Sequence, residues 1–118
     1  MDYTEYLPDI DVEDGKARVM NNLKLYLRLI EKFDGAKMAG AVTCAIDAGD
    51  EKATVAAAHA LKGTAANLGF SVVKKITGDI EALIKEGMDC SILAQPLTEA
   101  MASLAGSIGR LLAAQEEL

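Results

Sequence analysis

The sequence predicts an all-α protein, an antiparallel up-and-down four-helix bundle with a short extra N-terminal helix. Apolar residues recur at helical spacing in successive segments. Alanine and leucine are abundant, whereas aromatic residues make up 4% of the chain and tryptophan is absent, a composition that favours helices over strands. The connections between segments are short, so neighbouring helices fold back on each other. The 118 residues suit a single domain spanning residues 1–118.

The N-terminal part is expected to begin with a solvated acidic lead-in over residues 1–10, although Leu7 and Ile10 could instead cover the domain. Asp11 can then cap a short helix over about residues 12–20. A second helix begins at Asn22, and Leu25 and Leu29 widen its apolar arc beyond the face that one neighbour covers. We therefore expect this helix to pack on two sides. A dimer or burial within one chain would both explain the wide arc, and we expect a monomer.

Two helices are expected in the middle of the chain. Gly35 offers a stop for the helix from Asn22, and the next apolar stretch ends at Gly49, a residue type that readily takes the left-handed conformation at helix C-termini. Asp50 is placed to cap the following helix over about residues 51–68.

Two further helices complete the predicted bundle. Gly69 breaks the apolar pattern, Ser71 can cap the next helix, and Gly87 ends it. The last helix begins near Leu93, because Pro96 is tolerated only in a first turn.

Charge and composition exclude several classes of function. A net charge of −6 and a pI near 4.7 argue against binding to nucleic acid or anionic membranes, which requires a basic patch. Two cysteines and one histidine cannot form a Cys/His zinc site, so we expect no bound metal. The N-terminus lacks signal-peptide features and no apolar run is long enough to span a bilayer, so a cytoplasmic location without membrane insertion is expected.

The single histidine, His59, lies in the middle of the helix predicted over residues 51–68. At about 100° per residue, Leu61 and Ala65 fall on the opposite side, so the imidazole should face solvent. Lys62 and Gly63 share its face, and a glycine in mid-helix costs roughly 1 kcal/mol relative to alanine. The small residue leaves room for an approaching group. Geometry alone also allows a merely solvated histidine.

The segment from Ala58 to Phe70, AHALKGTAANLGF, resembles the motif of the histidine phosphotransfer (HPt) domain family, H-x-L-K-G-x-x-x-x-x-G. The motif positions are filled by His59, Leu61, Lys62, Gly63 and Gly69. The resemblance extends to the leucine- and tyrosine-bearing first helix at residues 22–26 and to the Ala-Gly-Asp step at residues 48–50.

This resemblance implies a phosphoryl carrier that has no ATP site and no independent turnover. His59 would accept a phosphoryl group through Nε2 from the phospho-aspartate of a receiver domain and pass it to another receiver. Lys62 would stabilise the phosphoryl oxygens and Gly63 would leave room for them. No bound cofactor is implied, since Mg²⁺ is expected on the receiver. A surface on the same helix would dock response-regulator receivers and a sensor or hybrid histidine kinase: Lys52, Val55, Ala56, Ala66 and Asn67.

Two other interpretations remain open on the sequence. The chain could be the detached phosphoacceptor domain of a chemotaxis-type or hybrid histidine kinase, phosphorylated by an ATP-bound catalytic domain. It could also be a helical adaptor that is not phosphorylated. The kinase interpretation requires an ATP-binding domain in the same polypeptide, whereas the adaptor interpretation makes His59 expendable.

Overall fold

The structure, a computed structural model, describes residues 2–116, with side chains described as far as residue 115. These residues form helices and no strand, so the predicted all-α class is confirmed. Two short 3₁₀ helices accompany six α-helices within the described range. In chain order they are η1 (Thr4–Tyr6), α1 (Val12–Ala17), α2 (Leu23–Glu31), α3 (Gly35–Asp47), α4 (Glu51–Leu68), α5 (Ser71–Lys85), η2 (Ser91–Leu93) and α6 (Ala94–Glu116).

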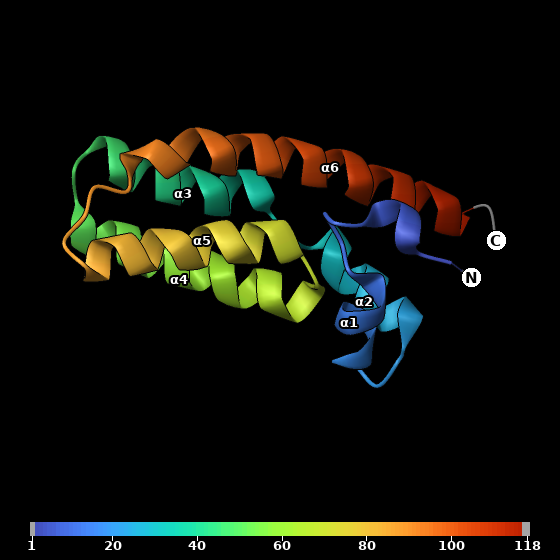
Figure 1. Ribbon diagram of the computed structural model, residues 1–118. Helices are drawn as coiled ribbons and strands as arrows, with labels where there is room; N and C mark the ends of the chain where they lie inside the picture. The colour runs from blue at the N-terminus through green and yellow to red at the C-terminus, as the bar shows by residue number, and fades with distance from the viewer. Residues whose placement is uncertain (1, 117–118) are drawn as a thin grey trace.

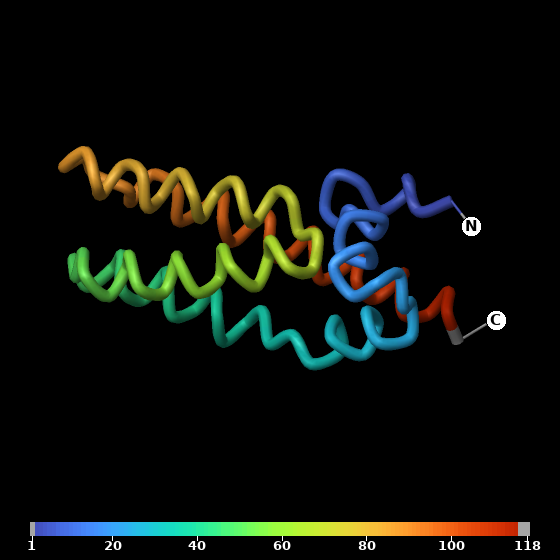
Figure 2. The backbone as a smooth tube through the Cα atoms, turned by 90° about the horizontal axis from the view of Figure 1, so that it is seen from below, coloured from blue at the N-terminus to red at the C-terminus, as the bar shows by residue number. Residues whose placement is uncertain are grey.

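The helices α3, α4, α5 and α6 lie side by side along the long dimension of the molecule, while α1 and α2 lie at the end where the two termini are found (Figures 1 and 2). The described part measures 48 × 24 × 21 Å along its principal axes. The helix α4 contacts α3 and α5 most extensively. It therefore lies within the bundle along much of its length, with one face left over for solvent.

Most of the predicted helix boundaries are correct, and side-chain caps explain the starts. The carboxylate of Asp11 accepts a hydrogen bond from the Asp14 amide at 3.1 Å, and that of Asp50 accepts one from Ala53 at 3.0 Å. The predicted C-terminal glycines Gly49, Gly69 and Gly87 have φ values of 68°, 80° and 74°. Such left-handed conformations are easily adopted only by glycine.

Three local predictions are wrong. The first helix ends at Ala17 rather than near residue 20, because Met20 and Asn21 adopt φ values of 58° and 59° and turn the chain. Gly35 is not a stop but the first residue of α3, which is capped by the side chain before it. Ser71 is likewise the first residue of α5 rather than its cap, and the residue that precedes it makes no side-chain cap hydrogen bond.

The lead-in is folded onto the domain rather than solvated. Asp9 accepts hydrogen bonds from Ser103 at 2.8 Å and from Ser107 at 2.7 Å, which ties it to α6. Leu7 stays 49% exposed. The segment nevertheless buries three apolar side chains among its acidic residues: Tyr3, Tyr6 and Ile10 are buried.

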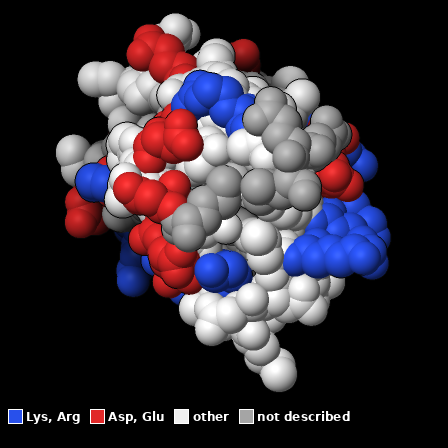
Figure 3. All heavy atoms as spheres, turned by 90° about the vertical axis from the view of Figure 1, so that its right-hand side faces the viewer, with Lys and Arg blue, Asp and Glu red and all other residues white. Residues whose placement is uncertain are grey.

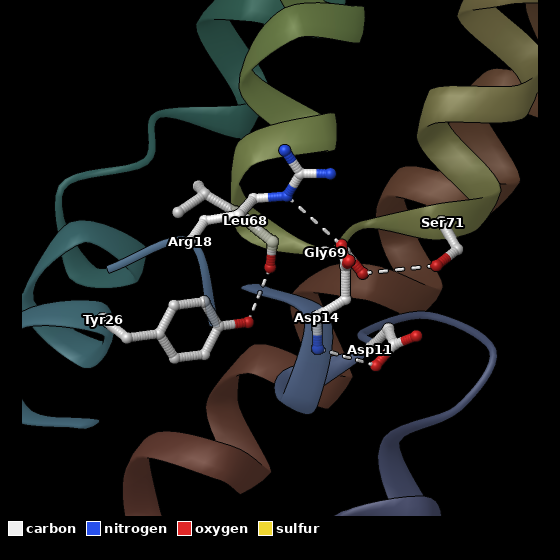
Figure 4. Close-up of polar contacts among 7 residues, drawn as sticks. All are labelled: Asp11, Asp14, Arg18, Tyr26, Leu68, Gly69 and Ser71. Carbon is white, nitrogen blue, oxygen red and sulfur yellow. Dashed lines mark hydrogen bonds and ion pairs between the residues drawn. The ribbon is translucent and has the colours of Figure 1, made fainter. Parts of the chain in front are cut away.

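The N-terminal elements close over the C-terminal end of α4 (Figure 4). The Tyr26 hydroxyl donates to the Leu68 carbonyl at 2.6 Å, and the Asp11 amide donates to the Gly69 carbonyl at 2.7 Å. A Cβ on Gly15 would lie 2.5 Å from Tyr26 Cε1 and 2.7 Å from the Leu68 oxygen. We call these five residues the N-terminal clamp. It satisfies two carbonyl groups that the end of a helix otherwise leaves without partners.

Only part of the wide apolar arc of α2 is buried within the chain. Tyr26 and Ile30 are buried, whereas Leu25 and Leu29 are 39% and 38% exposed. The helix nevertheless contacts both α1 and α4, so the expected packing on two sides is confirmed, although Leu25 and Leu29 stay partly exposed. The monomeric state stays a prediction.

Charged side chains are unevenly distributed on the end of the molecule that carries the termini. Figure 3 shows most of the acidic side chains on the left of this end and a large basic group at the right, with further basic side chains among the acidic ones. The first turn of α1 carries two acidic residues, Glu13 and Asp14. Neither side is uniformly basic, in keeping with the net charge of −6.

Candidate functional site

His59 projects from the exposed face of α4, and its side chain is 73% exposed. The opposite face of the helix forms part of the core, so the direction of the imidazole follows from helical geometry. That inner face carries the buried residues Thr54, Ala58, Leu61, Ala65 and Leu68. The helix is thus anchored along one side and presents the histidine on the other.

A carboxylate from α5 meets the histidine. Glu81 Oε2 lies 3.4 Å from His59 Nδ1, and Glu81 Oε1 lies 3.1 Å from Lys62 Nζ. The Glu81 side chain is only 20% exposed, so it lies largely within the groove between the two helices. A single carboxylate therefore faces both functional groups that the motif contributes.

Sequence reasoning missed Glu81, although the order of the elements contains a signal for it. α4 and α5 form an antiparallel hairpin around Gly69 and Phe70, and His59 and Glu81 lie equally far in sequence from Phe70 on either side. Residues that are equally distant from a tight turn face each other across an antiparallel pair. Since the motif occupies only α4, it gave no reason to examine α5.

The position of Glu81 has a chemical consequence for the imidazole. A carboxylate beside one ring nitrogen favours the tautomer that carries its proton on that nitrogen. The 3.4 Å separation of Glu81 Oε2 and Nδ1 is long for a hydrogen bond but close for a charge interaction. With the proton on Nδ1, Nε2 keeps its lone pair and faces away from Glu81. The arrangement suits a nucleophile at Nε2.

Lys62 is held towards α5 rather than extended into solvent. Its side chain is 34% exposed, and Glu81 Oε1, which lies 3.1 Å from it, is buried without a hydrogen-bond partner in the described structure. The ammonium group of Lys62 thus supplies the charge compensation that this oxygen needs. The aliphatic stem of Lys62 passes close to Gly78 on α5, where a Cβ would lie 3.7 Å from Lys62 Cδ, an ordinary van der Waals contact.

Gly63 has open space around it. Apart from its chain neighbours and the backbone of its own helix, no atom of the described residues would lie within 4 Å of a Cβ at this position, so internal packing does not require a glycine. The residues expected to dock a partner all lie on α4 with some exposure: Lys52, Ala56 and Asn67 are exposed, and Val55 and Ala66 are partly buried. Two hollows flank this face, one lined by Val55, Glu81 and Lys85, the other by Leu29, Phe33, Met38 and Asn67 among others.

The remaining reactive groups lie apart from this site. Cys44 is exposed on α3, while Cys90 is buried next to η2, where burial raises the pKa of its thiol. Within the described residues, no group of three or more His, Cys, Asp or Glu side chains is arranged to hold a metal ion. Across the same part of the chain, none of the helices combines the length and the apolar character needed to cross a membrane.

The comparisons with known proteins bear on these residues directly. The family model of the Hpt domain matches residues 26–115, a range that contains His59, Lys62, Gly63 and Glu81. Comparison with curated proteins and with solved structures finds no match. The matched range begins at the tyrosine of the N-terminal clamp, so the lead-in and α1 lie outside it.

Proposed function

We propose that this chain, which belongs to the Hpt domain family, accepts a phosphoryl group on His59 from the phospho-aspartate of a receiver domain and passes it to a second receiver. The family performs histidine phosphotransfer in two-component signalling, and its members are phosphoryl carriers. The single observation that carries the assignment to His59 is its geometry: the only histidine of the chain is 73% exposed, with Glu81 3.4 Å from Nδ1.

Transfer of the phosphoryl group to His59 requires chemical groups from two sources only, the exposed face of α4 and the receiver domain. The lone pair of Nε2 attacks phosphorus, an N–P bond forms, and the P–O bond to the receiver's aspartate breaks, with its electron pair left on the carboxylate. Such transfers depend mainly on in-line positioning and charge neutralisation. Mg²⁺ held by the receiver would neutralise the phosphoryl oxygens, so the proposal requires no cofactor on this chain.

The neighbouring residues have separate roles in this proposal. Lys62 would share its positive charge between Glu81 and the incoming phosphoryl oxygens. Gly63 would allow the partner to approach α4 closely, as its open surroundings permit. The docking surface would consist of Lys52, Val55, Ala56, Ala66 and Asn67. The partners would be response-regulator receivers together with a sensor or hybrid kinase, and the domain would act in the cytoplasm as a monomer.

The test is phosphoryl transfer from a panel of phosphorylated receiver domains to the wild type and to His59→Gln. We expect label on the wild type only, as phosphate that is labile in acid and stable in alkali. Equal labelling of both proteins would contradict the assignment to His59. If the folded wild type takes label from no receiver but does so from a histidine kinase catalytic domain with ATP, the chain acts as a kinase phosphoacceptor domain instead.

A further inference from the structure

The turn between α1 and α2 and the face of α2 that follows it expose large apolar side chains. Met20 is 90% exposed, and Leu25 and Leu29 are 39% and 38% exposed. These are three of the six large exposed apolar side chains among the described residues. Met20 lies on the turn that the left-handed φ values of 58° and 59° produce, and Figure 1 shows this turn projecting at the end of the molecule that carries the termini. Exposed apolar side chains that gather on one segment mark a contact surface.

Unpaired cations lie beside these apolar side chains. Lys24, Arg28 and Lys32 are exposed and follow each other at a spacing of four residues, so they form one row along α2. At about 100° per residue, this row lies next to the row formed by Leu25 and Leu29. None of the three cations takes part in the ion pairs of the described residues. Their charges are therefore free to meet a partner.

The charge of this segment differs in sign from that of the chain. Residues 20–32 contain three cations and one anion, Glu31, so they carry a net charge of +2, whereas the whole chain carries −6. The carboxylates of the neighbouring helix α1 are paired with nearby cations. Charges are screened over about 8 Å at physiological ionic strength, and the described part of the molecule is 48 Å long. A surface that touches residues 20–32 therefore meets a positive charge, although the net charge of the chain argues against anionic membranes.

We propose that residues 20–32 bind an anionic lipid surface, with Met20, Leu25 and Leu29 among the headgroups and the row of cations against the lipid phosphates. A row of cations beside a row of apolar side chains is the pattern of helices that lie on membrane surfaces. The helix α4 extends away from this end (Figures 1 and 2), so His59, in its middle, stays accessible while the segment is bound. The inference goes beyond the proposed function and does not depend on it.

The experiment measures the partition of the protein onto vesicles by sedimentation. Vesicles of phosphatidylglycerol and phosphatidylcholine in equal parts are compared with vesicles of phosphatidylcholine alone. The variant Lys24→Gln/Arg28→Gln removes two cations of the row on α2. The matched control Lys74→Gln/Lys75→Gln removes the same charge from two exposed positions of α5. Circular dichroism establishes that each protein is folded.

We expect the wild type to bind the anionic vesicles about a hundredfold more strongly than the neutral ones, since each cation near an anionic surface contributes about a factor of five. For the same reason, the partition coefficient of Lys24→Gln/Arg28→Gln on anionic vesicles should fall about 25-fold, whereas that of the α5 control should stay within about twofold of the wild type. No binding to anionic vesicles, equal binding to the two kinds of vesicle, or equal losses in the two variants would overturn the inference.

Phosphoryl transfer from receivers separates a lipid surface from an acidic protein as the partner of this face. If the segment binds lipid alone, Lys24→Gln/Arg28→Gln should accept phosphate from a receiver in solution as fast as the α5 control does. If the α2 variant accepts phosphate more slowly and the wild type does not bind anionic vesicles, the face belongs to an acidic protein partner and the inference is wrong.

A second measurement uses the wild type alone and two methionines at opposite ends of the molecule. Met20 lies on the α1–α2 turn, and Met88, which is 55% exposed, lies between α5 and η2 at the other end (Figure 1). The methyl groups of methionine are labelled with ¹³C, and anionic vesicles that contain a paramagnetic lipid are added. The signal of Met20 should broaden much more strongly than that of Met88. Equal broadening of the two signals, or stronger broadening of Met88, would show that residues 20–32 do not face the lipid.

Discussion

Gly63 and Gly69 lie fewer than two turns apart, yet their surroundings are opposite. Among the described residues, a Cβ on Gly63 would meet no atom of another segment within 4 Å, whereas one on Gly69 would collide with the backbone carbonyl of Asp11. The first glycine belongs to the open face around His59, and the second belongs to the N-terminal clamp. The comparison shows that the exposed face of α4 and the structure that holds the end of α4 are separate. Substitutions in the two regions should therefore change different measurements, and the predictions follow in order of their effect on the free energy of unfolding.

The largest effect is expected from Gly69→Val in the clamp. The residue has a φ of 80°, which is strained for a β-branched side chain, and its Cβ would overlap the Asp11 backbone. We expect the free energy of unfolding to fall by about 3 kcal/mol or more, measured by urea denaturation. Gly49→Val provides the control, because it has a similar φ of 68° but open space around it. Equal losses in the two variants would mean that backbone strain alone, without the contact to Asp11, explains the effect.

Tyr26→Phe should have the next largest effect. It removes the 2.6 Å hydrogen bond to the Leu68 carbonyl while keeping the ring in the core. The expected loss is about 1 to 2 kcal/mol, because a buried carbonyl loses its donor. Phosphoryl transfer to the folded variant should be unchanged. A large loss of transfer with intact folding would contradict the separation of the two regions.

The same pair of proteins gives a prediction for alkaline pH. Burial raises the pKa of the Tyr26 phenol above its ordinary value, so the folded state favours the protonated form. The stability that this preference contributes is present below the unfolded pKa of about 10 and is lost as the pH rises further. The stability advantage of the wild type over Tyr26→Phe should shrink above about pH 10. Burial also raises the pKa of Tyr6, but both proteins contain that residue. A constant difference across the alkaline range would show that Tyr26 is not responsible.

The clamp and the site also differ in how far they can be predicted from the sequence. The outward direction of His59 follows from periodicity within one helix, and the start of α4 follows from the local cap at Asp50. Both depend on residues that are close in sequence, for which helical geometry is a sufficient guide. The fold class is predictable for the same reason.

Contacts between distant segments were not predictable from local patterns. The hydrogen bond of Tyr26 joins residues 42 positions apart, and that of Asp9 with Ser107 spans 98 positions. The composition of the acidic stretch that contains Asp9 suggested that its side chain would be solvated. Instead, the packing of this stretch against α6 brings Asp9 within hydrogen-bonding distance of Ser103 and Ser107. Glu81 is an intermediate case, since the hairpin register would have placed it opposite His59 had the register been considered.

Lys62→Met should have a smaller effect on stability and a clear effect on transfer. The substitution keeps much of the aliphatic stem over Gly78 but leaves Glu81 Oε1 without its cation. We expect a loss of about 1 kcal/mol in the free energy of unfolding, since the pair is partly exposed. Transfer from a receiver should slow about tenfold, because a charge that neutralises the phosphoryl oxygens is lost. Lys75→Met, whose partner Asp79 is exposed, is the control. Unchanged transfer kinetics in Lys62→Met would count against an electrostatic role for this lysine.

Gly63→Leu should have the smallest effect on stability, and the only one of opposite sign. Leucine forms helices better than glycine, and no described atom lies within 4 Å of the new Cβ, so the free energy of unfolding should rise by up to about 1 kcal/mol. Receiver binding and phosphoryl transfer should fall sharply, because the larger side chain occupies the space beside His59 that a partner needs. Gly63→Ala should gain similar stability with much less loss of transfer, since a methyl group protrudes little. A stabilised Gly63→Leu variant that still binds and accepts phosphate normally would show that the partner does not approach this face of α4, and the proposed docking surface would have to be placed elsewhere around the histidine.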